Sequence, residues 1–208
     1  MKILELSGVS CEKQDRELFH NINLTLTGGE LLFLKGENGA GKTSLIRIIT
    51  GLSRPTSGDV LIQQENIHKY PDAAKKLVYC GHKLGLNANL SALENLGFWC
   101  QLHGKPVDNA ELQIVLENLG LEGLEDLPVK HLSAGQQRRA SLAKLWLSTN
   151  ASLWVLDEPF TALDVNTVKL LCHQVDSFVN AGGAVVMTSH QQVELTCKTS
   201  EFYLEYHW

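Results

Sequence analysis

The chain has 208 residues and a formal net charge of −5, and 44% of its residues are hydrophobic and 20% charged. This length suits one domain with or without an inserted subdomain, and the composition is that of an ordinary globular protein. The mildly acidic balance gives no support for nucleic-acid binding through bulk electrostatics. No apolar run approaches the roughly 20 residues of a transmembrane helix, so membrane association is expected to be indirect.

The cysteines give no sign of a disulfide framework or a metal site. There are five of them, an odd number, and none is spaced for metal binding or redox chemistry. The first residues, up to Leu6, resemble a strand rather than a secretory leader. We therefore expect reduced, mostly buried thiols in the cytoplasm.

Strand-like and helix-like segments alternate along the chain. Residues 31–35 are predicted to form a buried strand, followed by a Gly-rich turn and a helix over 42–50. Residues 153–156 and 184–188 are two further short apolar strands. Short apolar strands alternating with helices are typical of a largely parallel sheet with helices on its faces, so the fold class is α/β.

The segment from about 83 to 147 differs because it contains no strand-like run. Ser91 and Glu94 form a capping-box pattern, and the helix predicted over 110–119 ends at Gly120. A second capping-box pattern, 133–136, leads into a helix over 137–147. We predict a single domain, 1–208, whose α/β core (1–82 and 148–208) carries an inserted all-helical subdomain (about 83–147).

The Gly-rich turn matches the phosphate-loop pattern G-x-x-x-x-G-K-[ST] between a strand and a helix. Its backbone N–H groups and the helix N-terminus are expected to bind phosphate oxygens. Lys42 adds a charge for the β- and γ-phosphates, and Thr43 a hydroxyl for Mg²⁺. The predicted ATP-binding residues are Gly36, Glu37, Asn38, Gly39, Ala40, Gly41, Lys42, Thr43 and Ser44.

Two carboxylates follow the apolar strand 153–156. Asp157 is expected to hold Mg²⁺ together with Thr43, and Glu158 to polarise the attacking water as general base. An acidic strand end alone is as often a plain surface feature as part of a functional site. Combined with the phosphate loop, it predicts a nucleotide-hydrolysing site.

The segment Leu132-Ser133-Ala134-Gly135-Gln136 resembles the LSGGQ signature of ABC transporter ATP-binding subunits, with alanine at its third position. Residues 161–164 resemble the family's D-loop, and His190 its switch histidine, a second catalytic residue. The resemblance covers nearly the whole chain. It implies a P-loop NTPase (RecA-like) core with N-terminal antiparallel strands. It also implies a dimer of two identical copies, in which Ser133, Gly135 and Gln136 contact the ATP of the other copy.

Within this family the chain is similar to the ATP-binding subunits of bacterial cytochrome c maturation systems. The resemblance lies in segments 51–55, 91–96, 132–139 and 157–164. It implies integral membrane partners of the CcmB and CcmC type, a peripheral place on the cytoplasmic face of the inner membrane, and ATP-driven release of a haem-loaded chaperone. An ABC exporter ATPase for another substrate is the alternative.

Two positions depart from the general ABC pattern. His82 stands where the Q-loop glutamine is usual, which makes it a further candidate metal ligand, or only a hinge residue. The loop expected over 10–16, after the first strand, has no aromatic residue to stack on adenine. Lys13 and Arg16 are candidates for a cation–π contact with the base. Phe19 is a more distant candidate and fits a core residue better, so weak discrimination between purine bases is expected.

Other function classes fit the sequence less well. A GTPase would need an Asn/Thr-Lys-x-Asp segment for base recognition, and the chain has none. Soluble ABC ATPases of repair or translation usually carry paired domains or long insertions. A non-enzymatic nucleotide sensor is disfavoured by the intact Lys42, Asp157, Glu158 and His190.

Overall fold

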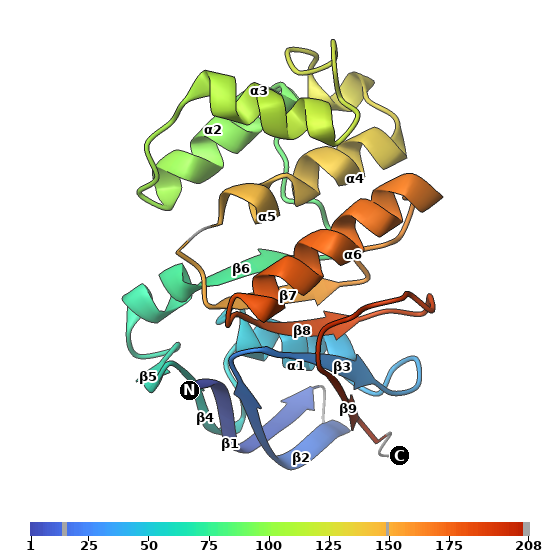
Figure 1. The fold of residues 1–208 in the computed structure, drawn as a ribbon. Coiled ribbons are helices and arrows are strands. Elements are labelled where there is room, and N and C mark those ends of the chain that lie inside the picture. Colours follow the sequence, from blue (N-terminus) through green and yellow to red (C-terminus); the bar gives the residue numbers. More distant parts are fainter. Residues whose placement is uncertain (14–15, 149, 206–208) are drawn as a thin grey trace.

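The computed structural model describes residues 1–13, 16–148 and 150–205, which form two β-sheets and a helical segment. The central sheet is parallel, in the order β6(Leu77–Cys80), β7(Leu153–Asp157), β8(Ala184–Thr188), β3(Glu30–Lys35), β9(Thr199–Tyr203). The second sheet is antiparallel, in the order β2(Arg16–Thr27), β1(Lys2–Lys13), β4(Ser57–Ile62), β5(Glu65–Asn66). Figure 1 shows the antiparallel sheet at one end of the molecule and the helical segment at the other.

The central sheet is covered on both faces, which explains its continuous apolar strands. Leu32 and Leu34 of β3 belong to the core formed with α1(Lys42–Ile49) and the antiparallel sheet. Leu31 belongs to the opposite core, which contains residues of α6(Val165–Asn180). Successive side chains of a strand point to opposite faces, so one short strand contributes to both cores.

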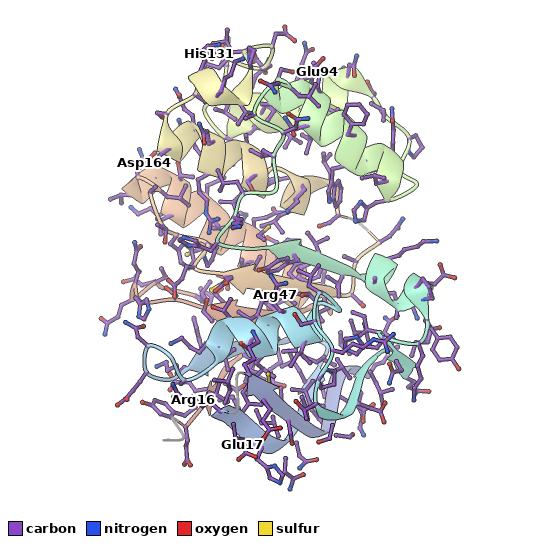
Figure 2. The ribbon with its side chains drawn as sticks, turned by 180° about the vertical axis from the view of Figure 1, so that it is seen from behind. Arg16, Glu17, Arg47, Glu94, His131 and Asp164 are labelled. Carbon is purple, nitrogen blue, oxygen red and sulfur yellow. The ribbon has the colours of Figure 1, made fainter. Side chains whose placement is uncertain are left out.

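The residues between β6 and β7 form α2(Ala92–Leu102), α3(Asn109–Asn118), α4(Ala134–Leu142) and α5(Lys144–Leu147), with a short 3₁₀ turn, η2(Val129–His131). A second 3₁₀ turn, η1(Pro71–Lys76), precedes β6. The helices share a third apolar core. Together with the two sheets, they confirm the predicted fold class. In Figure 2, Glu94 and His131 of this segment lie far from Arg16 and Glu17 of β2.

Both predicted capping boxes are present, at the N-termini of α2 and α4. The single helix predicted over 137–147 is wrong in extent, because the Ser133 cap starts α4 already at Ala134. The helix is also interrupted at Ala143, where Trp146 N–H donates to the Ala143 carbonyl over three residues rather than four.

The predicted loop over 10–16 is also wrong for its described residues. Lys13 ends β1 and Arg16 begins β2, and these two residues pair across the strands. Cys11 pairs with Phe19, and both are buried, so the apolar pattern continues the hairpin to its tip. Gln14 and Asp15 lie outside the described residues.

The cysteines are free and buried, as expected from the sequence. Burial, followed by a hydrogen bond to Asp176, raises the pKa of the Cys197 thiol to about 12. In the described part of the chain, no helix is both long and apolar enough to cross a membrane.

Candidate active site

The phosphate loop, residues 36–41, joins the carboxyl end of β3 to α1. Gly41, which caps α1, has φ 99°, and a Cβ there would lie 3.1 Å from the buried Phe19 ring. Glycine is therefore needed both for the left-handed backbone and for the close approach. Lys42 Nζ donates to the carbonyls of Gly36 at 2.7 Å and Glu37 at 3.0 Å, which holds the ammonium group over the loop.

Asp157 and Glu158 lie where β7 ends beside β8. Asp157 is paired in register with Thr188, whose hydroxyl donates to Asp157 Oδ1 at 2.8 Å. The Glu158 N–H donates to the Thr188 hydroxyl oxygen at 3.0 Å and to its carbonyl at 3.2 Å. Thr188 thus orients both acidic residues. The sequence analysis missed this role, although a hydroxyl residue ending an otherwise apolar strand was its visible signal.

His190 follows β8 and contacts Glu158. Its backbone N–H donates to Glu158 Oε2 at 3.1 Å, and its ring Nε2 lies 3.7 Å from Glu158 Oε1. The imidazole side chain is 67% exposed, while the Glu158 side chain is only 23% exposed. The carboxylate is thereby fixed, and the imidazole is left accessible to a ligand.

The phosphate loop and these residues border one cavity of about 320 Å³. A second cavity, of about 890 Å³, adjoins it and shares Lys42, Glu158, Thr188 and His190. The described residues lining the smaller cavity are Leu18, Asn38, Gly39, Gly41, Lys42, Thr43, Ser44, Asp157, Glu158, Thr188 and His190. The fold therefore brings together residues from four separate parts of the sequence.

The oxygen atoms in this cavity fit a hard divalent cation. Thr43 Oγ1 and Asp157 Oδ2 form no hydrogen bond with any described residue, whereas Asp157 Oδ1 is taken by Thr188. Among residues 1–13, 16–148 and 150–205, no cluster of three or more His, Cys, Asp or Glu side chains is arranged to hold a metal. Mg²⁺ commonly uses one or two protein oxygens and completes its shell with phosphates and water, so such a cluster is not required.

The predicted signature residues lie elsewhere. Ser133, Gly135 and Gln136 form the N-terminus of α4 and line neither cavity. The Ser133 hydroxyl accepts from the Gln136 N–H at 3.3 Å. A Cβ on Gly135 would lie 2.9 Å from the Ala162 carbonyl, so only glycine allows α4 to pack this closely against the segment after Glu158.

His82 is exposed and lines neither cavity. Its backbone neighbour Gly81 follows β6, at the same sheet edge as Asp157. The structure thus places His82 near this edge without bringing it to the phosphate loop.

The structure shows the contacts of two candidates for binding the base, Lys13 and Phe19. Lys13 Nζ donates to the hydroxyl of Ser44 in α1 at 3.0 Å. Phe19 is 1% exposed and belongs to the core, while its neighbour Leu18 lines the smaller cavity. An apolar side chain, rather than an aromatic ring, therefore borders the smaller cavity on the β2 side.

Comparison with known proteins gives consistent results. The sequence pattern of the ABC transporter family matches residues 19–161. The cytochrome c biogenesis ATP-binding export protein CcmA of Escherichia coli O6:H1 is 46% identical over 196 residues, which cover 94% of this chain and 92% of the relative. The CcmA protein of E. coli K12 is 45% identical over the same shares.

Solved structures share the fold. A putative ABC transporter ATP-binding protein from Pyrococcus furiosus has a TM-score of 0.80 and 25% identity, over 97% of this chain and 96% of the other. A dimeric bacterial ABC transporter cassette has a TM-score of 0.82 and 22% identity, over 98% and 94%. Together with the family match and the CcmA relatives, these likenesses lead to one assignment: the chain belongs to the ABC transporter family, in its group of cytochrome c biogenesis ATP-binding proteins.

Proposed function

We propose that this chain hydrolyses ATP as a subunit of a membrane ABC complex of the cytochrome c maturation system. The observation that supports this most directly is the cavity that Lys42, Thr43, Asp157 and Glu158 share with His190. Its residues are those that phosphoryl transfer to water requires: a cradle for phosphates, a place for a cation, and a carboxylate base. The 46% identity to a cytochrome c biogenesis ATP-binding export protein supports the choice of system.

In this proposal, the phosphate loop and Lys42 bind the β- and γ-phosphates. Mg²⁺ bound by Thr43 and Asp157 would neutralise charge on the phosphate oxygens. Glu158 accepts the proton of the attacking water, and the backbone N–H of His190 orients the carboxylate through Oε2. The exposed imidazole of His190 contacts the γ-phosphate. Thr188 keeps Asp157 and Glu158 in register.

The active form in this proposal is a dimer of two identical chains. Ser133, Gly135 and Gln136 would contact the nucleotide of the partner copy through the α4 N-terminus, where backbone N–H groups and the helix dipole favour an anion. The position of these residues outside both cavities of their own chain supports this arrangement. ATP would close the sandwich and hydrolysis would reopen it.

The proposed partners are integral membrane subunits of the CcmB and CcmC type, on the cytoplasmic face of the bacterial inner membrane. The core (1–82 and 148–208) would bind nucleotide, and the helical subdomain (about 83–147) would transmit the movement through the surface from His82 to Leu96. ATP turnover would then drive release of a haem-loaded chaperone.

The substitution Glu158→Gln tests the hydrolysis step. It keeps the size and shape of the side chain but removes the base, so ATP binding should persist while turnover falls by about 10²–10⁴-fold. Nucleotide affinity by calorimetry and phosphate release by the assembled complex measure the two effects. Glu117→Gln, a change at an exposed carboxylate of α3 that lines neither cavity, is the matched control. Normal turnover in the Glu158 variant would exclude this residue as the base.

The Glu158→Gln variant also tests whether the chain acts in the cytochrome c maturation system. In membranes that contain the complex, haem should still load onto the chaperone, but the loaded chaperone should stay trapped in the complex. Haem staining of the purified complex measures this. Unimpaired release of the chaperone would contradict the release role. Co-purification with membrane subunits of a different transport system would favour the alternative, an ABC exporter ATPase for another substrate.

A further inference from the structure

The buried guanidinium of Arg138 forms hydrogen bonds with the backbone of residues 157–159, which include the proposed base Glu158. Arg138 of α4 is 4% exposed, and its guanidinium donates to four main-chain carbonyls. No carboxylate forms an ion pair with it in the described part of the chain. Arginine stays protonated in proteins. Direct hydrogen bonds to carbonyls, together with longer-range attraction to the Asp157 and Glu158 carboxylates, therefore compensate this buried charge, which would be costly without them.

Three of the four carbonyls belong to consecutive residues around the proposed base. Arg138 Nη2 donates to the Asp157 carbonyl at 3.2 Å and also to that of Glu158, and Nε donates to the Pro159 carbonyl at 3.2 Å. Glu158 has φ 51°, a left-handed conformation that is unusual for a residue with a side chain. Such a conformation persists only where its surroundings hold it in place.

The peptide groups on the two sides of Glu158 are held from different elements. On one side, its N–H donates to Thr188 of β8. On the other side, its carbonyl accepts from Arg138 of α4. The guanidinium therefore fixes the backbone direction from which the Glu158 carboxylate projects.

The fourth carbonyl is that of Gly81, which accepts from Arg138 Nη1 at 2.9 Å. Gly81 immediately follows β6, and His82 comes next. A single side chain thus joins the ends of β6 and β7 to α4, the helix that Ser133 caps. A planar group with five N–H donors is suited to this task, whereas a lysine ammonium is not.

We propose that Arg138 is a positioning residue for hydrolysis: its guanidinium holds the Glu158 backbone against α4 and the end of β6, so that the carboxylate keeps its place beside the cavity. This inference rests on the proposed function. Arg138 lines neither cavity, so it acts through Glu158 and not on the nucleotide itself.

The test compares Arg138→Met and Arg138→Lys with a matched control, Lys144→Met. Lys144 Nζ donates to the Tyr79 carbonyl at 2.7 Å, so it also joins the helical segment to β6, but it bonds to none of residues 157–159. The thermal midpoint of each full-chain variant is measured first. ATP turnover and ATP affinity are then measured at a temperature well below the lowest of these midpoints.

We expect Arg138→Met to lower kcat at least about tenfold while the Kd for ATP changes by less than about threefold, because a base displaced by a fraction of an ångström loses rate and not binding. Arg138→Lys should recover part of the loss, since an ammonium can replace some of the bonds. Lys144→Met should lower the thermal midpoint but keep kcat. If Arg138→Met does not fold, the comparison of Arg138→Lys with Lys144→Met gives the same discrimination.

Equal kcat losses at Arg138 and Lys144, or unchanged kcat in the Arg138 variants, would overturn the inference. So would a loss of kcat matched by an equal loss in the number of ATP-binding sites per chain, which indicates a smaller folded fraction. Absence of turnover in the unmodified chain and its assembled complex would instead contradict the proposed function.

Discussion

At the scale of single residues, the hydroxyl of Thr188 forms hydrogen bonds with both acidic residues of the site. It is 1% exposed, donates to the Asp157 carboxylate, and accepts from the Glu158 N–H. Both acidic residues therefore depend on one buried oxygen atom. Loss of a hydrogen bond to a charged group in such a place costs about 1.5–3 kcal/mol.

We predict that Thr188→Val lowers kcat about 10–160-fold, which is that energy expressed as a rate. Valine preserves the branched shape but leaves the Glu158 N–H with only the Thr188 carbonyl and frees the Asp157 carboxylate to rotate. Thr188→Ser, which retains the hydroxyl, is the control. Steady-state ATPase assays measure both variants, and equal activity of the valine and serine variants would contradict the role.

A second residue-scale prediction concerns the base of the nucleotide. No aromatic side chain lines the smaller cavity among the described residues, and Lys13 is engaged with Ser44. We therefore expect ATP and GTP to bind with affinities within about tenfold of each other, a difference of less than 1.4 kcal/mol. Competition titrations with the Glu158→Gln variant measure this ratio. A strong preference for ATP would show that an adenine-specific contact exists.

At the scale of elements, Asp176 ties α6 to the segment before β9. Its carboxylate accepts from the backbone N–H groups of Thr196 and Cys197 at 3.0 Å, and from the Thr196 hydroxyl at 2.8 Å. Burial opposes ionisation, but these hydrogen bonds outweigh it and lower the pKa of the Asp176 carboxyl. The anchoring therefore depends on the ionised form.

We predict that Asp176→Ala lowers the free energy of unfolding by roughly 1–2 kcal/mol at neutral pH, discounted for partial exposure. A carboxyl whose pKa is lower in the folded state stabilises above its unfolded pKa, and this contribution is lost as the pH falls through the folded pKa. The difference between variant and parent should therefore shrink below about pH 4. Urea denaturation at several pH values measures it.

Asp72→Ala is the matched control for this prediction. Asp72 is an exposed carboxylate with a lowered pKa, caused first by its hydrogen bond to Lys75. Solvent screens such a surface pair, so its removal should change stability little. A loss as large as that for Asp176 would mean that charge alone, and not the anchoring of the segment, accounts for the effect.

At the scale of the whole molecule, the two groups of residues that would contact ATP in the proposed dimer, the phosphate loop and the α4 N-terminus, lie apart within one chain. The phosphate loop is at the end of β3 in the central sheet, and Ser133 caps α4 in the helical segment (Figure 1). Asp164, which caps α6 through the Thr167 N–H, lies between these regions in Figure 2. A second copy is therefore the natural source of the missing contacts to each nucleotide.

We predict that ATP converts the Glu158→Gln chain from monomer to dimer, and that Ser133→Glu in that background abolishes the conversion. The added carboxylate would face phosphate oxygens, and like charges in contact repel. Sedimentation velocity with and without ATP measures the assembly, and calorimetry checks that the monomer still binds nucleotide. Ser177→Glu, on an exposed position of α6, is the control and should still dimerise. Dimers in the Ser133 variant would contradict the sandwich.

Local sequence was sufficient for the features whose physics is local. The phosphate loop, the capping boxes at Ser91 and Ser133, and the strand over 184–188 were all predicted, because each depends on backbone conformation or on the burial of a short apolar run. The extent of α4 and the hairpin around residues 10–16 were not, because element boundaries depend on packing and strand pairing as well as on propensity.

The tertiary structure alone decided which distant residues meet. Thr188 joins Asp157 only because β7 and β8 are neighbours in register, and Arg138 reaches Asp157, Glu158, Pro159 and Gly81 only because α4 packs over the ends of β6 and β7. The sequence determined that the chain carries a phosphate loop with two carboxylates after a buried strand. The pairing of strands and the packing of one helix determined how those carboxylates are held, since hydrogen bonds between residues far apart in the chain leave no periodic signal in it.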